Sequence, residues 1–387
     1  MLLQSHKSAG CLVFIALIVS LAAKSTRADN FTIIDQEGKA VAVEARLAGS
    51  GQEVHALELA DGRLLIVPQS AVEKREIAEG PEPLDGNAVA AKLQKTFGEE
   101  NIRTYVQKPF VIGLVLAGRR GEPPDETRIR GFLKKAERFF DGVQANFLKH
   151  IRRVRIQASA PIYPLVVLIF EADSGFDRYA SAVTGNRGLS AQNMAGFYSP
   201  LTNYLTLRMS ECDTFDTPLH EAIHQQVYNR GIFQRLAPIP TWFNEGIATA
   251  FEGDGERVRN GPMQVSERYA KLALRAQVVD WREVVRNDRA FRGDVFAGEA
   301  YGHAWGLHWL LANKYKVEYL KYMQLLSVKK PLEKEEPEKR LSDLEEIMQK
   351  DVGALQKEFY EVIARELKQR SSLDALALPL DAARGSG

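Results

Sequence analysis

The sequence predicts an α+β fold, with a small β module at the N-terminus and a larger domain of mixed sheet and helices behind it. Three observations lead to this prediction. Short apolar segments with tight turns fill the first part of the chain, and longer segments with helical spacing of apolar residues fill the rest. The pentapeptide His-Glu-Ala-Ile-His at 220–224 indicates a metal site on one of the helices. The composition, 45% hydrophobic and 26% charged over 387 residues, is sufficient for a sizeable core.

Residues 1–28 have the features of a signal peptide. Lys7 precedes an apolar run at 11–23, which is shorter than a membrane-spanning helix requires. Cleavage can follow Thr26-Arg27-Ala28, or Leu21-Ala22-Ala23 slightly earlier. We therefore expect an exported protein, periplasmic, secreted or held at the cell surface. A membrane is an expected partner only if this segment stays uncleaved as an anchor.

The charge and the cysteines limit the partners. Removing residues 1–28 takes away three basic residues and no acidic one, so the formal charge changes from +1 to 48 minus 50, or −2. Neither value provides the basic field that nucleic acids require, and we expect no nucleic-acid partner. Cleavage also removes Cys11 and leaves Cys212 alone, so the mature chain can form no internal disulfide. We expect Cys212 to be a buried, inert thiol.

The first folded segment, residues 29–77, has a β pattern. Apolar residues alternate with others at 41–47, and Asp61-Gly62 is a hairpin turn between two apolar runs. The run from Asp35 through Gly38-Lys39 to Val67-Pro68 resembles the SH3-like modules found at the front of many secreted bacterial proteins. The resemblance implies a small β-barrel. Its role is open between binding, spacing and simple packing on the next domain.

A polar segment with two prolines, residues 78–86, follows as a linker to a domain at 87–370. This domain begins with a predicted strand from Tyr105 to Ala117 and a long core helix from Glu126 to Ile151. A buried strand at 164–171 and a hairpin at 196–209 come next. Further helices follow at 299–311 and 352–367, and we expect residues 371–387 to be a flexible tail.

The pentapeptide lies in a segment with helix start and stop signals. Thr217 suits the N-cap, Pro218 suits the first helical position, and Gly231 suits a left-handed C-terminal cap. These signals predict a helix at 218–230. A second helix is predicted at 241–252, ended by Gly253. The second helix carries Glu245.

Residue types and spacing in these two helices are those of a zinc site. His220 and His224 are four residues apart, so both imidazoles lie on one face of the helix. Glu221 lies about 100° round the helix, close enough to take a proton from water at the site. Catalytic zinc needs three protein ligands and one open position, and Glu245 completes the set. A His-Glu-x-x-His pattern alone also arises by chance, so the second helix with Glu245 is needed to support a metal site.

His220, Glu221, His224 and Glu245 resemble the signature of the gluzincin zinc metallopeptidases, which are thermolysin-like. The stretch from 106 to 367 also resembles a little-characterised bacterial branch, through Gly196-Phe197-Tyr198-Ser199-Pro200 and Tyr301-x-x-Ala304-Trp305. The resemblance implies a zincin-like fold, one Zn²⁺ per chain bound by the two histidines and Glu245, and Glu221 as general base. It departs at Thr249, where those enzymes place an aspartate that orients a histidine.

Other residues have open roles. Tyr301 or His303 could donate a hydrogen bond to the oxyanion, although either could be a core residue. We expect His308 to be a core histidine. In gluzincins an edge strand pairs with the substrate, so 196–198 or 205–207 could form one wall of the cleft.

The predicted protein is thus an exported, monomeric zinc metallopeptidase that hydrolyses peptides or proteins. Two alternatives remain open. One is a non-catalytic surface or matrix protein that keeps the fold for binding, against which the intact Glu221 argues. The other is an aminopeptidase, which would need an acidic anchor for the substrate amine that the sequence does not identify.

Overall fold

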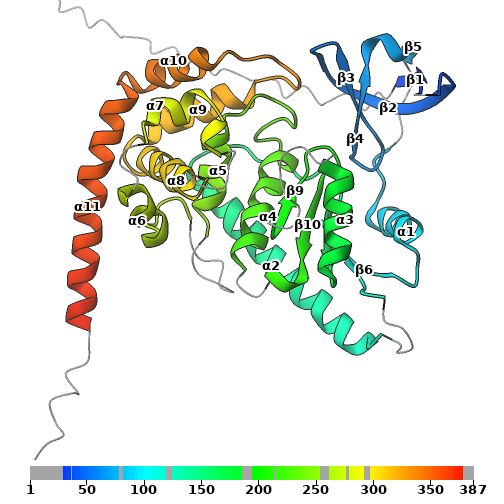
Figure 1. Cartoon of the computed structure of the whole chain (residues 1–387), viewed down its shortest axis with the longest axis horizontal. Coiled ribbons are helices and arrows are strands. Elements are labelled where there is room, and N and C mark those ends of the chain that lie inside the picture. The colour runs from blue at the N-terminus through cyan, green and yellow to red at the C-terminus, as the bar shows by residue number, and fades with distance from the viewer. Residues whose placement is uncertain are drawn as a thin grey trace, which may run out of the picture.

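The structure is a computed structural model of the chain. It describes residues 29–35, 37–77, 82–118, 124–184, 194–212, 215–252, 261–275, 279–291 and 297–377. The predicted signal peptide and the start of the predicted linker lie outside these residues. The α+β prediction is confirmed, with two sheets and a mostly helical C-terminal half (Figure 1).

The N-terminal module is one antiparallel sheet with the strand order β4-β3-β2-β1-β5. Its strands are β1 (Asp29–Ile34), β2 (Ala40–Gly51), β3 (Val54–Glu58), β4 (Leu64–Pro68) and β5 (Val72–Ile77), with a 3-10 turn, η1 (Gln69–Ala71), before β5. The Asp61-Gly62 turn is present, and Gly62 has a φ of +81°, which favours glycine. The pattern of alternation places Phe31, Ala45 and Leu57 in a small core of the module's own.

The expected closed barrel is not formed. The outer strands β4 and β5 are not paired with each other among the described strands, so the sheet is open. A register shift between Leu47 and Gly49 bends β2, so that its first part pairs with β1 and its last part with β3. Sequence patterns predicted β2 and the hairpin of β3 and β4 but not β5. Closure depends on how far the sheet curls, which the pattern does not encode.

The second sheet has the order β6-β7-β8-β10-β9. Its strands are β6 (Ile102–Gln107), β7 (Phe110–Val115), β8 (Leu165–Phe170), β9 (Gly196–Tyr198) and β10 (Tyr204–Arg208). The three central strands are parallel, and the outer strands β6 and β9 are antiparallel to their neighbours. The predicted hairpin at 196–209 is therefore confirmed, with β9 at the edge of the sheet. The predicted single strand at 105–117 is wrong, because the chain turns at Lys108-Pro109 and forms a hairpin of β6 and β7.

Helices cover both faces of this sheet. The helices of the chain are α1 (Gly86–Phe97), α2 (Glu126–Arg153), α3 (Asp173–Thr184), α4 (Asp216–Asn229), α5 (Thr241–Thr249), α6 (Glu267–Arg275), α7 (Trp281–Arg286), α8 (Ala297–Lys314), α9 (Lys316–Ser327), α10 (Pro337–Met348) and α11 (Val352–Ala377). Every residue of β8 is buried. Its residues 165, 167 and 169 pack in one core with α2 and α4, and residues 166, 168 and 170 pack in another with α1 and α3.

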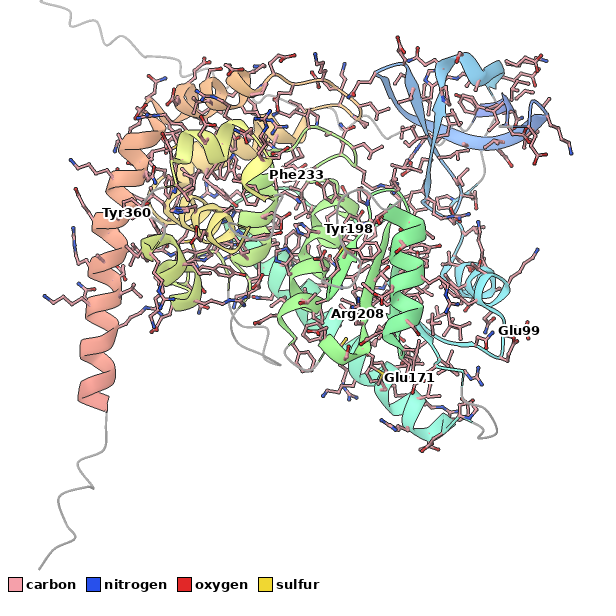
Figure 2. The ribbon with its side chains drawn as sticks, viewed as in Figure 1. Glu99, Glu171, Tyr198, Arg208, Phe233 and Tyr360 are labelled. Atoms are coloured by element: carbon pink, nitrogen blue, oxygen red, sulfur yellow. The ribbon has the colours of Figure 1, made fainter. Side chains whose placement is uncertain are left out.

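The C-terminal helices pack around α8, which lies against α5 and α6. Two glycines allow this packing: a Cβ on Gly246 of α5 would lie 2.7 Å from the carbonyl oxygen of Ala304, and one on Gly302 of α8 would lie 2.9 Å from Leu272. On the far side, α11 carries Tyr360 and continues to Ala377, beyond Arg370 where the sequence analysis ends the domain (Figures 1 and 2). Within the described residues, no helix is long and apolar enough to cross a membrane.

Candidate metal centre

The histidine helix, α4, begins at Asp216, two residues earlier than its sequence signals suggest. Phe215 occupies the N-cap in a left-handed conformation, with a φ of +59°, and no side chain caps the helix there. Thr217 and Pro218 therefore lie in the first turn rather than at its border. The predicted end is correct, since Gly231 follows the helix with a φ of +69°.

The carboxylate helix, α5, packs on α4 and ends at Thr249 rather than at the predicted 252. Trp242 and Phe243, on the same helix, are completely buried; Trp242 stacks on Tyr322 of α9, and Phe243 packs edge-to-face against His308 of α8. The loop between the two helices contributes Phe233, which is buried against Phe243 on the helical side of the molecule (Figure 2). This packing directs Glu245 toward α4.

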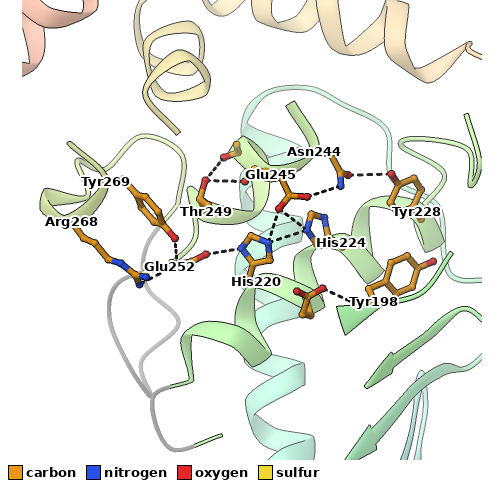
Figure 3. A network of polar contacts seen from close by, with 12 residues as sticks. Tyr198, His220, His224, Tyr228, Asn244, Glu245, Thr249, Glu252, Arg268 and Tyr269 are labelled. Atoms are coloured by element: carbon orange, nitrogen blue, oxygen red, sulfur yellow. Dashed lines mark hydrogen bonds and ion pairs between the residues drawn. The ribbon is translucent and has the colours of Figure 1, made fainter. Parts of the chain in front are cut away.

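Three side chains converge where α4 and α5 meet (Figure 3). His220 Nε2 lies 3.0 Å from Glu245 Oε2 and 3.0 Å from His224 Nε2, and His224 Nε2 lies 3.5 Å from the same carboxylate oxygen. Two ligands bound tetrahedrally to zinc at about 2.0–2.1 Å are about 3.3 Å apart. The three ligand atoms therefore have the separations of a zinc site, and the residues present fit the ion.

The histidines and carboxylates of this cluster shift one another's pKa values. Burial alone would lower the pKa of His220, but hydrogen bonds to Glu245 and Glu252 raise it well above its ordinary value. Burial alone would raise the pKa of Glu245, but His224 and His220 lower it well below its usual range. A divalent cation bound by the same atoms would require them to be deprotonated.

The second nitrogen of His220 faces a carboxylate that the sequence analysis did not identify. Glu252 Oε1 lies 2.6 Å from His220 Nδ1, and Tyr269 of α6 donates its hydroxyl to Glu252 Oε2. Arg268 lies 3.8 Å from the same oxygen. A carboxylate in this position fixes the tautomer and the orientation of a ligand histidine.

Thr249 does not take the place of the orienting aspartate. Its hydroxyl donates to the carbonyl oxygens of Glu245 and Gly246, at 2.9 and 3.1 Å, and so bonds within its own helix. The chain instead delivers the carboxylate from Glu252, after the helix has ended. A carboxylate therefore faces His220 even though position 249 carries a threonine.

Glu221 is held from the sheet side. The backbone N–H of Tyr198 in β9 donates to its Oε2 at 2.8 Å. Burial raises the pKa of Glu221, partly offset by His220 and His224. A carboxylate with a raised pKa is better matched to proton transfer near neutral pH than an exposed one.

Tyr301 lies at the cluster and His303 has other surroundings. The rings of Tyr301 and His220 are 6.2 Å apart, and the nearby Glu245 carboxylate, together with burial, raises the pKa of Tyr301. His303 is completely buried, and its Nδ1 accepts a hydrogen bond from the indole of Trp281 at 3.0 Å.

His308 is buried beside Tyr319, as expected of a core histidine. Cys212 is half-buried rather than buried as expected, and its thiol donates to the carbonyl oxygen of Arg208.

Further polar residues support the ligand carboxylate. Asn244 donates to Glu245 Oε1 at 3.4 Å and accepts from Tyr228 at 3.1 Å, and the ring of Tyr228 stacks on Tyr198. Asn244 is next to Glu245 in sequence, but its neighbour Tyr228 could not be inferred from spacing. The sequence offers one indication for Glu252: it is an acidic residue directly before Gly253, close to the segment that carries Glu245.

Comparison with known proteins adds a family without an assigned role. Residues 215–333 match the family described as "Protein of unknown function (DUF1570)". The match begins at the N-cap of α4 and includes both ligand helices and α8, but it covers less than a third of the chain. No curated protein matches the sequence.

Proposed function

We propose that the protein is an exported zinc metallopeptidase that hydrolyses peptide bonds in a peptide or protein substrate. One observation carries the proposal: His220, His224 and Glu245, from two different helices, meet at ligand separations suited to tetrahedral zinc, with Glu221 beside them. The two histidines and Glu245 would hold the ion. When bound, zinc lowers the pKa of water and polarises a carbonyl group.

Glu221 acts as the base. It accepts a proton from the attacking water and returns it to the leaving amine, so it must alternate between the charged and neutral states. Its raised pKa favours this exchange, because burial brings the two states closer in free energy at neutral pH. The N–H of Tyr198 holds Oε2 and thereby fixes the direction of the carboxylate.

Tyr301 and β9 provide contacts for the substrate. Because the hydroxyl of Tyr301 lies close to Glu245 and keeps its proton at neutral pH, it can donate a hydrogen bond to the developing oxyanion. β9 is the edge strand, and its Tyr198 N–H points away from β10 toward Glu221. A substrate in extended conformation can pair along this outer edge, which places its backbone beside the base. This supports 196–198, rather than the internal strand β10, as a wall of the cleft.

The test is metal content and cleavage measured on the same samples. The purified protein should contain about one zinc ion per chain by elemental analysis and should cleave casein or a mixed-peptide library. His220→Ala should lose both. His55→Ala, which removes a histidine from β3 in the N-terminal module, is the matched control and should lose neither.

Two results would contradict the proposal. A protein that binds no zinc even after reconstitution has no metal centre. A protein that binds zinc through His220 but cleaves none of the substrates, with Glu221 intact, would instead fit the alternative of a binding protein that keeps the fold.

A further inference from the structure

The N-terminal module makes polar contacts with two segments that frame the site, the turn at 199–203 between β9 and β10 and the loop at 230–240 between α4 and α5. Arg235 of that loop joins all three parts. Its Nη1 donates to the carbonyl oxygens of Gly62 and Pro200, at 2.7 and 3.0 Å, and its Nη2 pairs with Glu58 at 2.6 Å. One guanidinium thus bonds the module and the β9–β10 turn at once.

These contacts are shielded from water. The side chain of Arg235 is 10% exposed and that of Glu58 is 9% exposed. Arg46, also in the module, pairs with Glu58. A buried pair of this kind fixes the orientation of its partners, because the planar guanidinium donates several hydrogen bonds in set directions. Loss of one partner would leave the other charge buried.

A backbone contact runs beside the guanidinium. The N–H of Leu64, the first residue of β4, donates to the carbonyl oxygen of Leu201 at 2.7 Å. The β9–β10 turn therefore receives two bonds from this side, one on Pro200 from Arg235 and one on Leu201 from the module itself. The module therefore helps to hold the β9–β10 turn, which lies at the edge of the second sheet.

A third contact links β2 to the loop at 230–240 through residues 331 and 332, which lie between α9 and α10. A Cβ on Gly49 would lie 2.7 Å from Pro331, and a Cβ on Gly51 would lie 2.4 Å from the carbonyl oxygen of Leu332, so β2 approaches this segment at a distance only glycine permits. The N–H of Leu332 in turn donates to Leu236, next to Arg235, at 2.9 Å. Figure 1 shows the loop between α9 and α10 reaching toward the module.

The β9–β10 turn leads directly to the base. Asn203, in the turn, accepts a hydrogen bond from the hydroxyl of Tyr198 at 2.7 Å and exchanges bonds with Asn229 of α4 at 2.8 Å. Tyr198 then donates its N–H to Glu221. The path from the module to the base is Gly62, Arg235, the turn, Tyr198 and Glu221, and each step is a direct contact or a turn of the backbone.

We propose that the N-terminal module is a fixed support of the active site and that Arg235 is a positioning residue, which holds the β9–β10 turn so that Tyr198 orients Glu221. This inference rests on the proposed function for its catalytic consequence. It answers the open question of the module's role, because a spacer or a tethered binding module would need no buried guanidinium shared with the site's own turn.

Arg235→Lys in the full chain tests the proposal. Lysine keeps the charge but cannot reach two carbonyl oxygens and a carboxylate with fixed geometry. Backbone hydrogen exchange of Tyr198 and Ser199 should rise by about tenfold or more, while exchange in β7 and β8 stays as in the wild type. The kcat should fall by about tenfold with zinc content unchanged.

Arg75→Lys is the matched control. It makes the same substitution in a charged pair of the module, where Arg75 Nε lies 2.6 Å from Asp29, far from the turn. It should leave exchange in β9 and kcat at the wild-type values. If Arg235→Lys does not fold, Glu58→Gln replaces it: this change keeps an acceptor for Arg235 but removes the charge, and should raise exchange in β9 by a smaller factor.

The outcomes separate this inference from the proposed function. Exchange at Tyr198 equal to that of the wild type, or an equal rise in β7 and β8, overturns the support role, whether or not the protein binds zinc. An active enzyme whose kcat does not change in Arg235→Lys overturns the positioning role. A protein without zinc or cleavage refutes the proposed function, and the exchange comparison then still decides whether the module holds the turn.

Discussion

The chain buries histidines in two different surroundings, on α4 and on α8. His220 of α4 lies between two carboxylates, Glu245 and Glu252, and its pKa is raised well above the ordinary value despite burial. His308 of α8 lies between Phe243 and Tyr319, and burial lowers its pKa to about 3. Both rings are enclosed by helices.

The difference teaches that neighbours, rather than burial or helical position, decide what a buried histidine does. A carboxylate pair stabilises the charge that a proton or a metal ion brings. An aromatic cage without carboxylates keeps the imidazole neutral and makes it a packing residue. His303 of α8 is also completely buried, and its Nδ1 accepts a hydrogen bond from the indole of Trp281.

The largest expected effect concerns Glu221, the base of the proposed mechanism. Glu221→Gln removes the base but no ligand, so zinc content should stay at the wild-type level while kcat falls by a factor of about 10²–10⁴. Glutamine retains an oxygen that can accept the N–H of Tyr198, so the local structure should persist. The measurement is kcat and zinc content on the same preparation.

A matched variant on the other helix sharpens the comparison. Replacing His303 of α8 by glutamine keeps an acceptor near Trp281 and should change kcat much less than Glu221→Gln does. Cleavage by Glu221→Gln at the wild-type rate would remove Glu221 from the mechanism and leave the metal centre without an assigned base.

The ligand cluster could be predicted from sequence because its geometry is local. His220 and His224 share a face through helical spacing, and Glu245 stands on a helix whose start is marked by Pro240. Glu252 could not be found in this way. It lies beyond the end of α5, and its direction depends on the turn that follows Thr249 and on the docking of α6.

The same distinction between local and long-range contacts explains which parts of the fold could be predicted. Periodicity predicted α2 and β8 almost to the residue, because both bury a regular pattern. It missed the hairpin at Lys108-Pro109, where apolar residues continue on both sides of the turn. It also missed the role of Arg235, whose partners Gly62 and Pro200 are distant in sequence and meet only when the module docks.

Glu252→Gln should have the next largest effect, on metal affinity rather than on the base. Glutamine can still bond His220 Nδ1 but carries no charge, so the ring becomes a weaker ligand. We expect zinc affinity to fall by about 10- to 100-fold, measured by competition with a chromophoric chelator. Thr249→Val, which removes a hydroxyl bonded within α5, is the control and should change this affinity little.

An unchanged affinity in Glu252→Gln would mean that the charge on Glu252 serves folding rather than the metal. The free energy of unfolding of the metal-free variant separates these roles. A loss of stability without a loss of affinity would assign Glu252 to holding α6 in place through Tyr269.

The smallest effect concerns His308 and the pH dependence of stability. Because burial lowers its pKa to about 3, native His308 stays neutral, while in the unfolded chain it binds a proton below about pH 6.5. The unfolded state therefore binds more protons, and this contribution to stability is lost as the pH falls from about 6.5 toward 3. His308→Gln cannot take up that proton but can still bond Tyr319 at the position of Nε2.

The free energy of unfolding of the wild type, minus that of His308→Gln, should thus fall by about 1–2 kcal/mol between pH 6.5 and 5. Denaturant titrations at each pH measure it, and contributions common to both proteins, such as metal release, cancel in the difference. A difference that does not change with pH would show that His308 is protonated in the folded state. It would then have surroundings more like those of His220, and the contrast between α4 and α8 would have to be explained by something other than their carboxylates.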